Sequence, residues 1–341
     1  MTSRDLVIRA LNHEPVDRIP RDLWVCSAVE NSRRDEAAEL ATRFPNDIVR
    51  PDFQYPSGKR SKGKPSRKGT HTDAWGCTWN VAADGAPGTL EASPLATVAE
   101  IAQYEPPWEL LKGINLATVN RNCAETSRFV LASTETRPFE RLQYLRGPQA
   151  ALADLRGGRK RVRSMLAMLH EFFCKEMELW ADSDVDGVIF RDNWGSQKGL
   201  LIAPEIWRDL FKPLYRDYCE ILQAKDKFAF FHSDGDISDI FGDLVKMGVD
   251  AIHSQLFAMK IERLAKRFRG RVTFWGEIDS HQTLPQGTVE EVREAVLRVR
   301  KALDFGSGGL IAQCEWGADV PMQNLVAAFE QWAQQLPMHA N

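Results

Sequence analysis

Short apolar runs that end in polar residues recur along the second half of the chain. Runs of this length that are apolar throughout are typical of strands buried on both faces. The five clearest runs are DGVIFRD (186–192), FAFFHSD (228–234), DAIHSQ (250–255), RVTFWGEID (271–279) and GGLIAQCEW (308–316). The segments SRFVLAST (127–134) and DIVRPDF (47–53) supply two earlier strands.

Amphipathic stretches lie between these runs, and their apolar residues recur every three or four positions, which predicts helices at 158–183, 204–225 and 288–305. Strands that alternate with helices require parallel pairing and crossover helices, so the fold class is α/β. The strand count approaches eight, and we expect one (β/α)8 barrel over residues 1–341, with an N-terminal helical extension. A doubly wound open sheet is the alternative, but no Gly-rich phosphate loop follows the first strand.

One segment breaks this alternation. Residues 54–76, QYPSGKRSKGKPSRKGTHTDAWG, are rich in Lys, Arg, Gly and Ser, and we interpret about 54–72 as a loop inserted after an early strand. Such a loop is either simply solvated or a lid that meets an anionic ligand. It lacks the interleaved aromatic residues of a nucleic-acid site.

The overall charge excludes some partners. The chain has 44 basic and 47 acidic residues and a net charge of −3, so nothing global attracts it to nucleic acid or to anionic lipid. The N-terminal segment has no apolar signal region and no window is apolar enough to span a membrane, so we expect a cytoplasmic protein. Six cysteines without CxxC spacing indicate reduced thiols.

The candidate chemistry lies at the ends of the apolar runs, because barrel enzymes place catalytic groups at the C-terminal ends of their strands. These positions hold Asp192 and Asn193, then His232, Asp234 and Asp236, then His253, Ser254 and Gln255, then Glu277 and Asp279, and finally Cys314 and Glu315. A histidine, a thiol and several carboxylates at one mouth suit either a metal site or acid/base catalysis. Spacing alone does not choose between them.

Several motifs in order along the chain resemble the uroporphyrinogen decarboxylase superfamily, above all its branch of cobalamin-associated methyltransferases. The motifs are TSRDLVIRALNHEPVDRIP near the N-terminus, DxWG at 73–76, PFERLQYLRG at 138–147, DGVIFRDNWGSQKGLLIAPEIW at 186–207, HSDGDI at 232–237, FWGEIDSHQTLPQGTVEEV at 274–292 and AQCEWGADVPMQN at 312–324. The resemblance implies a (β/α)8 barrel, and a homodimer is expected from it.

The chain departs from the decarboxylases of this superfamily. Their N-terminal arginine-rich motif, RQAGRYxPEYR, holds the carboxylates of the tetrapyrrole, whereas the matching region here reads RIPRDLWVCSAVENSRR. Decarboxylation of uroporphyrinogen is therefore not expected. Asp52 nevertheless lies near the position of the decarboxylase's catalytic aspartate.

The methyltransferases of the branch bind zinc through a His-x-Cys pair and a distant Cys. Here the pattern is His232-Ser233-Asp234 followed by Cys314, so Asp234 replaces one thiolate. A carboxylate makes a harder site and weakens the case for a thiol substrate. Glu277 is either a further ligand or a free acid/base.

The leading hypothesis is a zinc-dependent methyl transfer between a small methylated substrate and a corrinoid (cobalamin) protein, with an O- or N-methyl group favoured over a thiol. Catalytic roles are assigned to Glu277, Asp192 and Asp234, and metal ligation to His232, Cys314, Asp234 and Glu277. Substrate contacts are assigned to Asn193, Trp194, Gln255, Trp275 and Asp52. The alternative is a metal-free decarboxylase or lyase in which Asp52 or Asp234 is the acid and His232 its partner. Stoichiometric metal and dependence on corrinoid separate these two hypotheses. A third hypothesis is a corrinoid- or tetrapyrrole-binding module that has kept the barrel and lost the chemistry.

Overall fold

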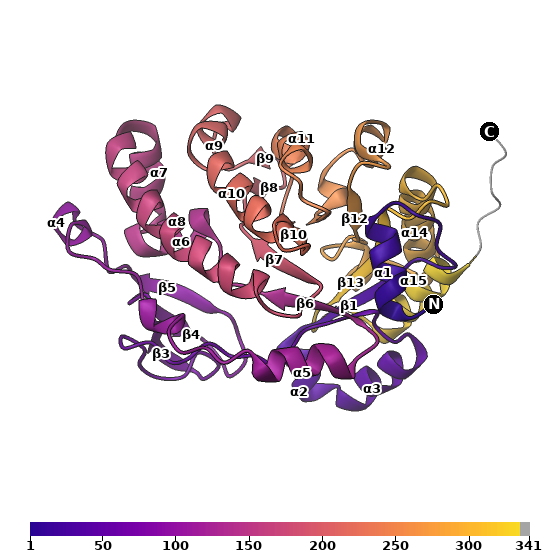
Figure 1. Cartoon of the computed structure of the whole chain (residues 1–341). Helices are drawn as coiled ribbons and strands as arrows, with labels where there is room; N and C mark the ends of the chain where they lie inside the picture. Colours follow the sequence, from indigo (N-terminus) through magenta and orange to yellow (C-terminus); the bar gives the residue numbers. More distant parts are fainter. Residues whose placement is uncertain (335–341) are drawn as a thin grey trace.

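Eight parallel strands form the central sheet of the computed structural model, which describes residues 1–334. Their order is β1-β13-β12-β11-β10-β7-β6-β2, and the sheet curls into a (β/α)8 barrel (Figure 1). The strands are β1 (Arg21–Val25), β2 (Ile48–Val49), β6 (Phe129–Ser133), β7 (Gly187–Arg191), β10 (Phe228–Ser233), β11 (Ala251–Ser254), β12 (Thr273–Trp275) and β13 (Leu310–Trp316). The predicted fold class is confirmed.

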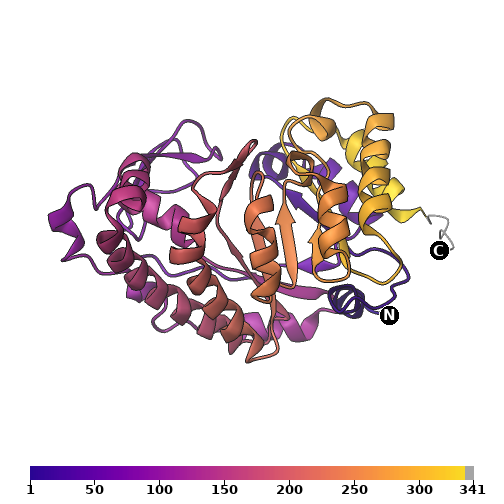
Figure 2. The ribbon, with the colours of Figure 1, turned by 90° about the horizontal axis from the view of Figure 1, so that it is seen from above.

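A helix follows each barrel strand and covers the outside of the sheet (Figures 1 and 2). These helices are α3 (Arg34–Arg43), α5 (Ala117–Glu125), α8 (Arg159–Ala181), α10 (Lys212–Gln223), α11 (Ser238–Lys246), α12 (Ile261–Phe268), α14 (Val289–Leu303) and α15 (Met322–Ala333). In residues 1–334 no helix has both the length and the apolar character that crossing a membrane requires.

The strands β1 and β2, which stand at the two ends of the sheet order, are joined by a backbone hydrogen bond and the Asn46 side chain rather than by a regular ladder. The Asp47 backbone N–H donates to the Arg21 carbonyl at 2.9 Å. The Asn46 side chain accepts from the Leu23 N–H at 2.8 Å and donates to the Leu23 carbonyl at 3.0 Å. The amide of Asn46 thus imitates one step of strand pairing between β1 and β2.

The two-residue period of each strand divides its side chains between two cores. Alternate residues point into the barrel, and the inner core contains Ile48, Phe129, Leu131, Ile189, Phe230, Ala251, Trp275 and Ile311. Their neighbours point outward against the helices, as Phe231 and Phe274 do. Val7 and Leu11 of α1 (Ser3–Leu11) join the inner core, so this helix closes the N-terminal end of the barrel.

The segment between β2 and α5 holds more structure than the predicted loop at 54–72. It includes a three-stranded antiparallel sheet of β3 (Gly69–Thr72), β4 (Thr78–Val81) and β5 (Gly88–Ala92). This part of the chain lies at one end of the molecule, away from the C-terminal helices (Figure 2). The apolar alternation that signals a strand is too weak in these short polar strands to predict them.

Two other boundaries differ from the sequence prediction. The helix expected over 204–225 is divided into α9 (Pro204–Leu210) and α10, because Pro213 cannot donate a backbone hydrogen bond in a helix interior and occupies the first turn of α10. The run 271–279 contributes only three residues to β12. The remaining elements are α2 (Ser27–Ser32), α4 (Val98–Ile101), η1 (Trp108–Leu110), α6 (Pro138–Arg146), α7 (Pro148–Gly157), β8 (Gly195–Ser196), β9 (Gly199–Leu200), η2 (Leu256–Ala258) and α13 (Thr283–Gln286).

Candidate active site

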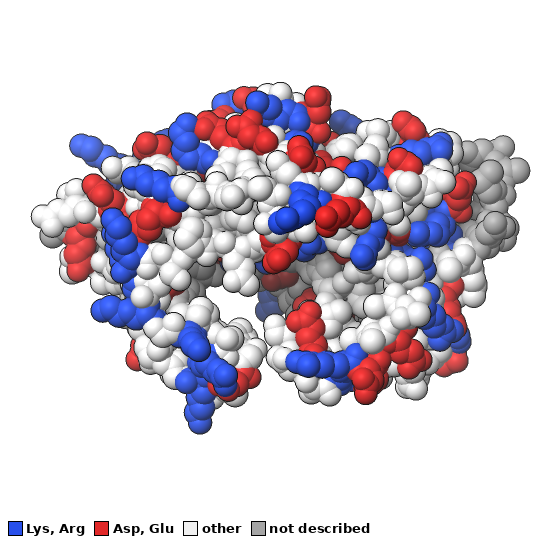
Figure 3. Space-filling view, turned by 60° about the horizontal axis from the view of Figure 1, so that its bottom comes forward, with Lys and Arg blue, Asp and Glu red and all other residues white. Residues whose placement is uncertain are grey.

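A cavity of about 500 Å³ lies inside the barrel, along the junction of β1 and β2 and up to the C-terminal ends of β6, β7 and β10. It is lined by Asp22, Leu23, Trp24, Val25, Asn46, Ile48, Val49, Arg50, Arg128, Ser133, Ile189, Arg191 and His232. A space-filling view shows a deep opening on one face of the molecule, with acidic and basic side chains around it (Figure 3).

A buried carboxylate lies on one wall of this cavity. Asp22 Oδ2 accepts hydrogen bonds from the indole N–H of Trp24 at 2.8 Å and of Trp275 at 3.0 Å. Burial raises the pKa of Asp22, while Arg50 and the two indoles act to lower it. Each indole has a single N–H donor, and both donate to the same carboxylate oxygen. The two hydrogen bonds therefore hold the carboxylate in one orientation.

Two neutral histidines lie next to Trp24. His253 stacks on the Trp24 ring with centroids 4.5 Å apart, and its Nδ1 lies 2.8 Å from Nδ1 of His232. Burial lowers the pKa of His253 to about 4. Burial, His253 and Arg191 lower the pKa of His232 well below its ordinary value. Both rings are therefore uncharged at neutral pH.

The two Nδ1 atoms share one hydrogen, so one ring donates to the other. The Gln313 side chain lies beside His253, acts to raise its pKa, and has no hydrogen-bond partner of normal geometry among the described residues. Nε2 of His232 lies 3.6 Å from Asp234 Oδ1.

Arginines occupy the side of the mouth formed by β2 and β7. The Arg50 guanidinium lies 5.8 Å from the Trp275 ring centroid. Burial lowers the pKa of Arg191, and the positive charges of Arg137 and Arg50 lower it further, against the opposing effect of Glu135. Nε of Arg191 is buried and has no hydrogen-bond partner among the described residues.

Carboxyl groups gather on the opposite side, beyond His232. Glu277, which follows β12, is only 4% exposed. Burial raises its pKa well above the ordinary value, and the nearby charges of Asp279, Asp234 and Glu315 raise it further. Burial also raises the pKa of Asp234, and His281 partly offsets this. Burial and the neighbouring carboxylates therefore favour the protonated form of Glu277.

The loops that follow β7 and β10 cross at very short range. A Cβ atom on Gly195 would lie 2.6 Å from the backbone carbon of Gly235, which has a φ of 75°. Neither position tolerates a larger residue without moving backbone. Asn193 holds the same crossing, because its Oδ1 accepts from the Asp234 N–H at 3.0 Å.

The structure brings together part of the predicted site. His232 lines the cavity, Asp234 lies next to it, and Glu277 lies close to Asp234. Trp275 lies inside the barrel, where it binds Asp22 rather than forming an open wall. Gln255 bonds to His281 at 2.8 Å, at the edge of the mouth. The catalytic and binding roles of these residues stay predictions.

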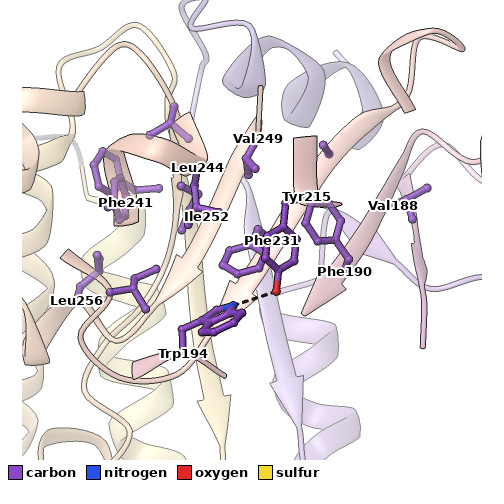
Figure 4. Close-up of a cluster of buried hydrophobic side chains, with 14 of the residues drawn as sticks. Val188, Phe190, Trp194, Tyr215, Phe231, Phe241, Leu244, Val249, Ile252 and Leu256 are labelled. Atoms are coloured by element: carbon purple, nitrogen blue, oxygen red, sulfur yellow. Dashed lines mark hydrogen bonds between the residues drawn. The ribbon is translucent and has the colours of Figure 1, made fainter. Parts of the chain in front are cut away.

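Asp192 and Trp194 do not lie where the sequence analysis expected them. The Asp192 carboxylate is fully buried and accepts hydrogen bonds from the N–H groups of Phe139 and Glu140 at 2.6 and 2.8 Å, at the start of α6. Trp194 is also fully buried, and its indole donates to Tyr215 within the outer core (Figure 4). Both side chains point outward from the barrel, where they pack the surrounding helices against the sheet.

Cys314 likewise points away from the cavity. It belongs to the outer core, and its thiol contacts Trp332 of α15. Burial raises its pKa to about 12, so it is a neutral thiol at neutral pH. In the described part of the chain no three His, Cys, Asp or Glu side chains converge to hold a metal ion. The predicted ligand set does not fit a zinc ion in this arrangement.

Two further predicted contacts lie at the periphery. Asp52 is exposed, is not among the residues that line the cavity, and its N–H donates to Asn122 Oδ1 at 3.0 Å. The Asn193 side-chain amide donates to Glu140 Oε1 at 3.3 Å, so both ends of this amide are used in contacts within the protein.

Sequence reasoning missed Asp22, Trp24, Arg50 and Arg191, which all line the cavity. A usable signal was present for three of them. Asp22 and Trp24 alternate with the apolar Leu23 in RDLWV, and Arg191 has the same parity as the inward-facing Ile189. Arg50 follows a strand of only two residues, too short to define a parity.

Comparison with known proteins identifies the family. The model of the family described as uroporphyrinogen decarboxylase (URO-D) matches residues 69–334. The chain belongs to the uroporphyrinogen decarboxylase family. No curated protein sequence matches it.

One solved structure with a TM-score above 0.5 shares the fold of this family member, and two others are similar to a lower degree. A methyltransferase from Methanosarcina mazei is 14% identical, with 97% of this chain and 98% of that chain covered and a TM-score of 0.68. Xylanase 10B from Thermotoga maritima is 12% identical over 97% of this chain and 98% of its own, with a TM-score of 0.47. A xylanase from Gloeophyllum trabeum is 9% identical over 96% and 98%, with a TM-score of 0.45.

Proposed function

We propose that this chain is a methyltransferase that moves a methyl group from a small O- or N-methylated substrate to a corrinoid carried by a partner protein. The observation that carries the proposal is Glu277, a carboxyl group that follows β12, is only 4% exposed and lies close to Asp234 and Glu315, with a pKa that burial raises well above its ordinary value. The methyltransferase from Methanosarcina mazei, which shares the fold, supports it as an analogy.

The chemistry of demethylation explains why a neutral acid is useful. When the bond between the methyl carbon and its oxygen or nitrogen breaks, the electron pair stays on the heteroatom and the methyl group leaves to the acceptor. A proton from Glu277 converts this poor leaving group into a neutral alcohol or amine. The Glu277 carboxylate then recovers a proton from solvent, and the cycle balances.

His232 has a supporting role in this scheme. Nε2 of its uncharged ring lies toward Asp234, so it can form a hydrogen bond with a substrate without adding a positive charge. Asp234 is half exposed and lies between His232 and Glu277 along the mouth.

The zinc ion implied by the family resemblance stays a prediction. His232 is paired with His253 and the Cys314 thiol faces α15, so the residues present do not form the expected ligand set. The homodimer and the cytoplasmic location also stay predictions.

Methyl transfer to free cob(I)alamin tests the proposal without the partner protein. The purified chain is incubated with methoxylated and N-methylated compounds, and methylcobalamin is followed by its absorbance. Glu277→Gln is expected to lower the rate by about 100-fold or more, the usual contribution of a general acid. Glu294→Gln on the exposed face of α14 serves as the matched control.

The pH dependence has a definite sign. The pKa of Glu277 is raised, so the active acid form persists to a higher pH than for an ordinary carboxyl group and is lost as the pH rises through that pKa. The wild-type rate should fall in this direction, and the residual rate of Glu277→Gln should not. Full activity in Glu277→Gln would refute the proposed role, and release of CO2 without methyl transfer would favour the lyase alternative.

A further inference from the structure

Two arginines in the cavity have no carboxylate bound to their guanidinium groups. Among residues 1–334, neither Arg50 nor Arg191 has an Asp or Glu oxygen within 4.0 Å of its side-chain nitrogens. A desolvated guanidinium without a hydrogen-bonded anion is costly to keep in a protein interior. Such an arrangement is typical of a site that receives its anion from a ligand.

The neighbouring arginines are paired, which makes these two distinctive. Arg141 binds Glu135 at 3.1 Å and Asp73 at 3.3 Å. Arg137 lies 3.8 Å from the same glutamate. Arg191 is next to this network but lies beyond the 4.0 Å range of its carboxylates.

The local charge indicates a ligand with a single negative charge. Arg50 follows β2 and Arg191 ends β7, whereas the third arginine of the lining, Arg128, is exposed and precedes β6 at the other end of the strands. Asp22 lies close enough to Arg50 for their charges to interact, which leaves the charge of Arg191 without a counter-charge at this end of the cavity. A carboxylate carries one negative charge and can accept two hydrogen bonds from the fork of a guanidinium.

The rest of the cavity favours a planar molecule. The Trp24 ring lines the cavity with its centroid 5.5 Å from that of His232, and His253 stacks on it. Ser133, at the end of β6, offers a further hydroxyl in the same cavity. His232 is the register partner of Arg191, so a flat substrate whose carboxylate binds the arginines would lie close to both His232 and Trp24.

We propose that Arg50 and Arg191 form a subsite for the carboxylate group of the small methylated substrate, so that the substrate class is a methylated carboxylic acid. That the substrate is methylated rests on the proposed function. That it carries a carboxylate does not. The two parts are separable, because binding can be measured without any methyl acceptor.

Equilibrium binding tests the subsite directly. Isothermal titration calorimetry with 4-methoxybenzoate and methoxyacetate compares an aromatic with an aliphatic carboxylate, and 4-methoxybenzamide is the uncharged control for the first. We expect both carboxylates to bind and the amide to bind at least about 10-fold more weakly, the minimum for a lost charge-assisted hydrogen bond. Equal binding of the amide, or tighter binding of inorganic phosphate, would overturn the proposal.

Variants assign the effect to the arginines. Arg191→Gln should weaken carboxylate binding by about 10- to 100-fold and Arg191→Lys by less, because lysine keeps the charge but loses the fork. Arg121→Gln, an exposed arginine on α5 outside the cavity, is the matched control. Unchanged carboxylate binding in Arg191→Gln would refute the subsite.

Thermal unfolding distinguishes a loss of binding in Arg191→Gln from a loss of folding. Arg191→Gln removes a desolvated charge that has no bound anion, so the ligand-free variant should be at least as stable as the wild type. 4-Methoxybenzoate should raise the melting temperature of the wild type and not that of the variant. A less stable variant that the ligand still stabilises would show that Arg191 has a structural role only. If carboxylates bind but no methyl transfer occurs, the subsite stands and the proposed function fails.

Discussion

Replacing Asp47 with alanine should destabilise the barrel where its first and last strands meet. The Asp47 carboxylate is 1% exposed and accepts four hydrogen bonds. Ser3 Oγ donates at 2.6 Å, the Arg21 N–H at 2.8 Å, and the two terminal nitrogens of Arg18 at 2.6 Å each. One side chain thus joins α1, β1 and the start of β2.

The magnitude follows from these four bonds. The bonds from Ser3 and the Arg21 N–H are shielded and charge-assisted, and each is worth roughly 1.5–3 kcal/mol. The Arg18 side chain is 39% exposed, so its ion pair adds only about 0–1 kcal/mol. We expect Asp47→Ala to lower the free energy of unfolding by roughly 4 kcal/mol and Asp47→Asn by about half of that.

The pH dependence gives a second check. Burial raises the pKa of Asp47, but the hydrogen bonds from Arg18, Ser3 and the Arg21 N–H outweigh it and hold the pKa below the ordinary value. The stabilisation is therefore present above the unfolded pKa of about 3.9 and is lost as the pH falls through the folded pKa. The difference between wild type and Asp47→Asn should shrink in acid.

Urea unfolding followed by circular dichroism at pH 7 and pH 3 measures both effects. Glu39→Gln, an exposed change on α3, is the control for charge alone. A loss under about 1 kcal/mol in Asp47→Ala would refute the reasoning, because it would mean that the junction of β1 and β2 does not depend on this carboxylate.

Two further predictions concern buried groups. Cys314→Ala should leave methyl transfer and the metal content of protein purified without chelator unchanged, since the thiol faces Trp332; one zinc per chain that disappears in this variant would contradict the structure. Burial raises the pKa of Glu176 to about 7, against hydrogen bonds from Tyr55 and Thr136. Wild-type stability should therefore fall as the pH rises through about 7, a slope that urea unfolding should not find in Glu176→Gln.

The fold could be predicted from the sequence because continuous apolar runs with amphipathic helices between them allow few arrangements. What escaped prediction was short or polar. The strand β2 has only two residues, and the sheet of β3, β4 and β5 has little apolar alternation. The junction at Asn46 and Asp47 uses side chains in place of a ladder, and no backbone periodicity reports that.

The candidate site was predicted less well. Residues were chosen because they lie near the end of a strand, but whether the side chain points into the barrel or outward also matters. In β10 and β13, His232 and Gln313 share the parity of the inward-facing Phe230 and Ile311. Cys314 has the opposite parity, as does Asp192 relative to Ile189 in β7. Counting residues in twos from the apolar core would have separated these outward positions from the cavity.

The mouth has two electrostatic halves. Arg50 follows β2 and Arg191 ends β7, whereas Glu277 follows β12 and Glu315 lies on β13. His232 lies between them, and a charged imidazole there would be repelled by Arg191 on one side. Its neutrality lets one substrate carry an anion toward the arginines and a developing negative charge toward Glu277. The acid and the anion subsite would then act on opposite ends of a single substrate molecule. When the substrate is absent, Glu277 and the arginines would not form an ion pair with each other.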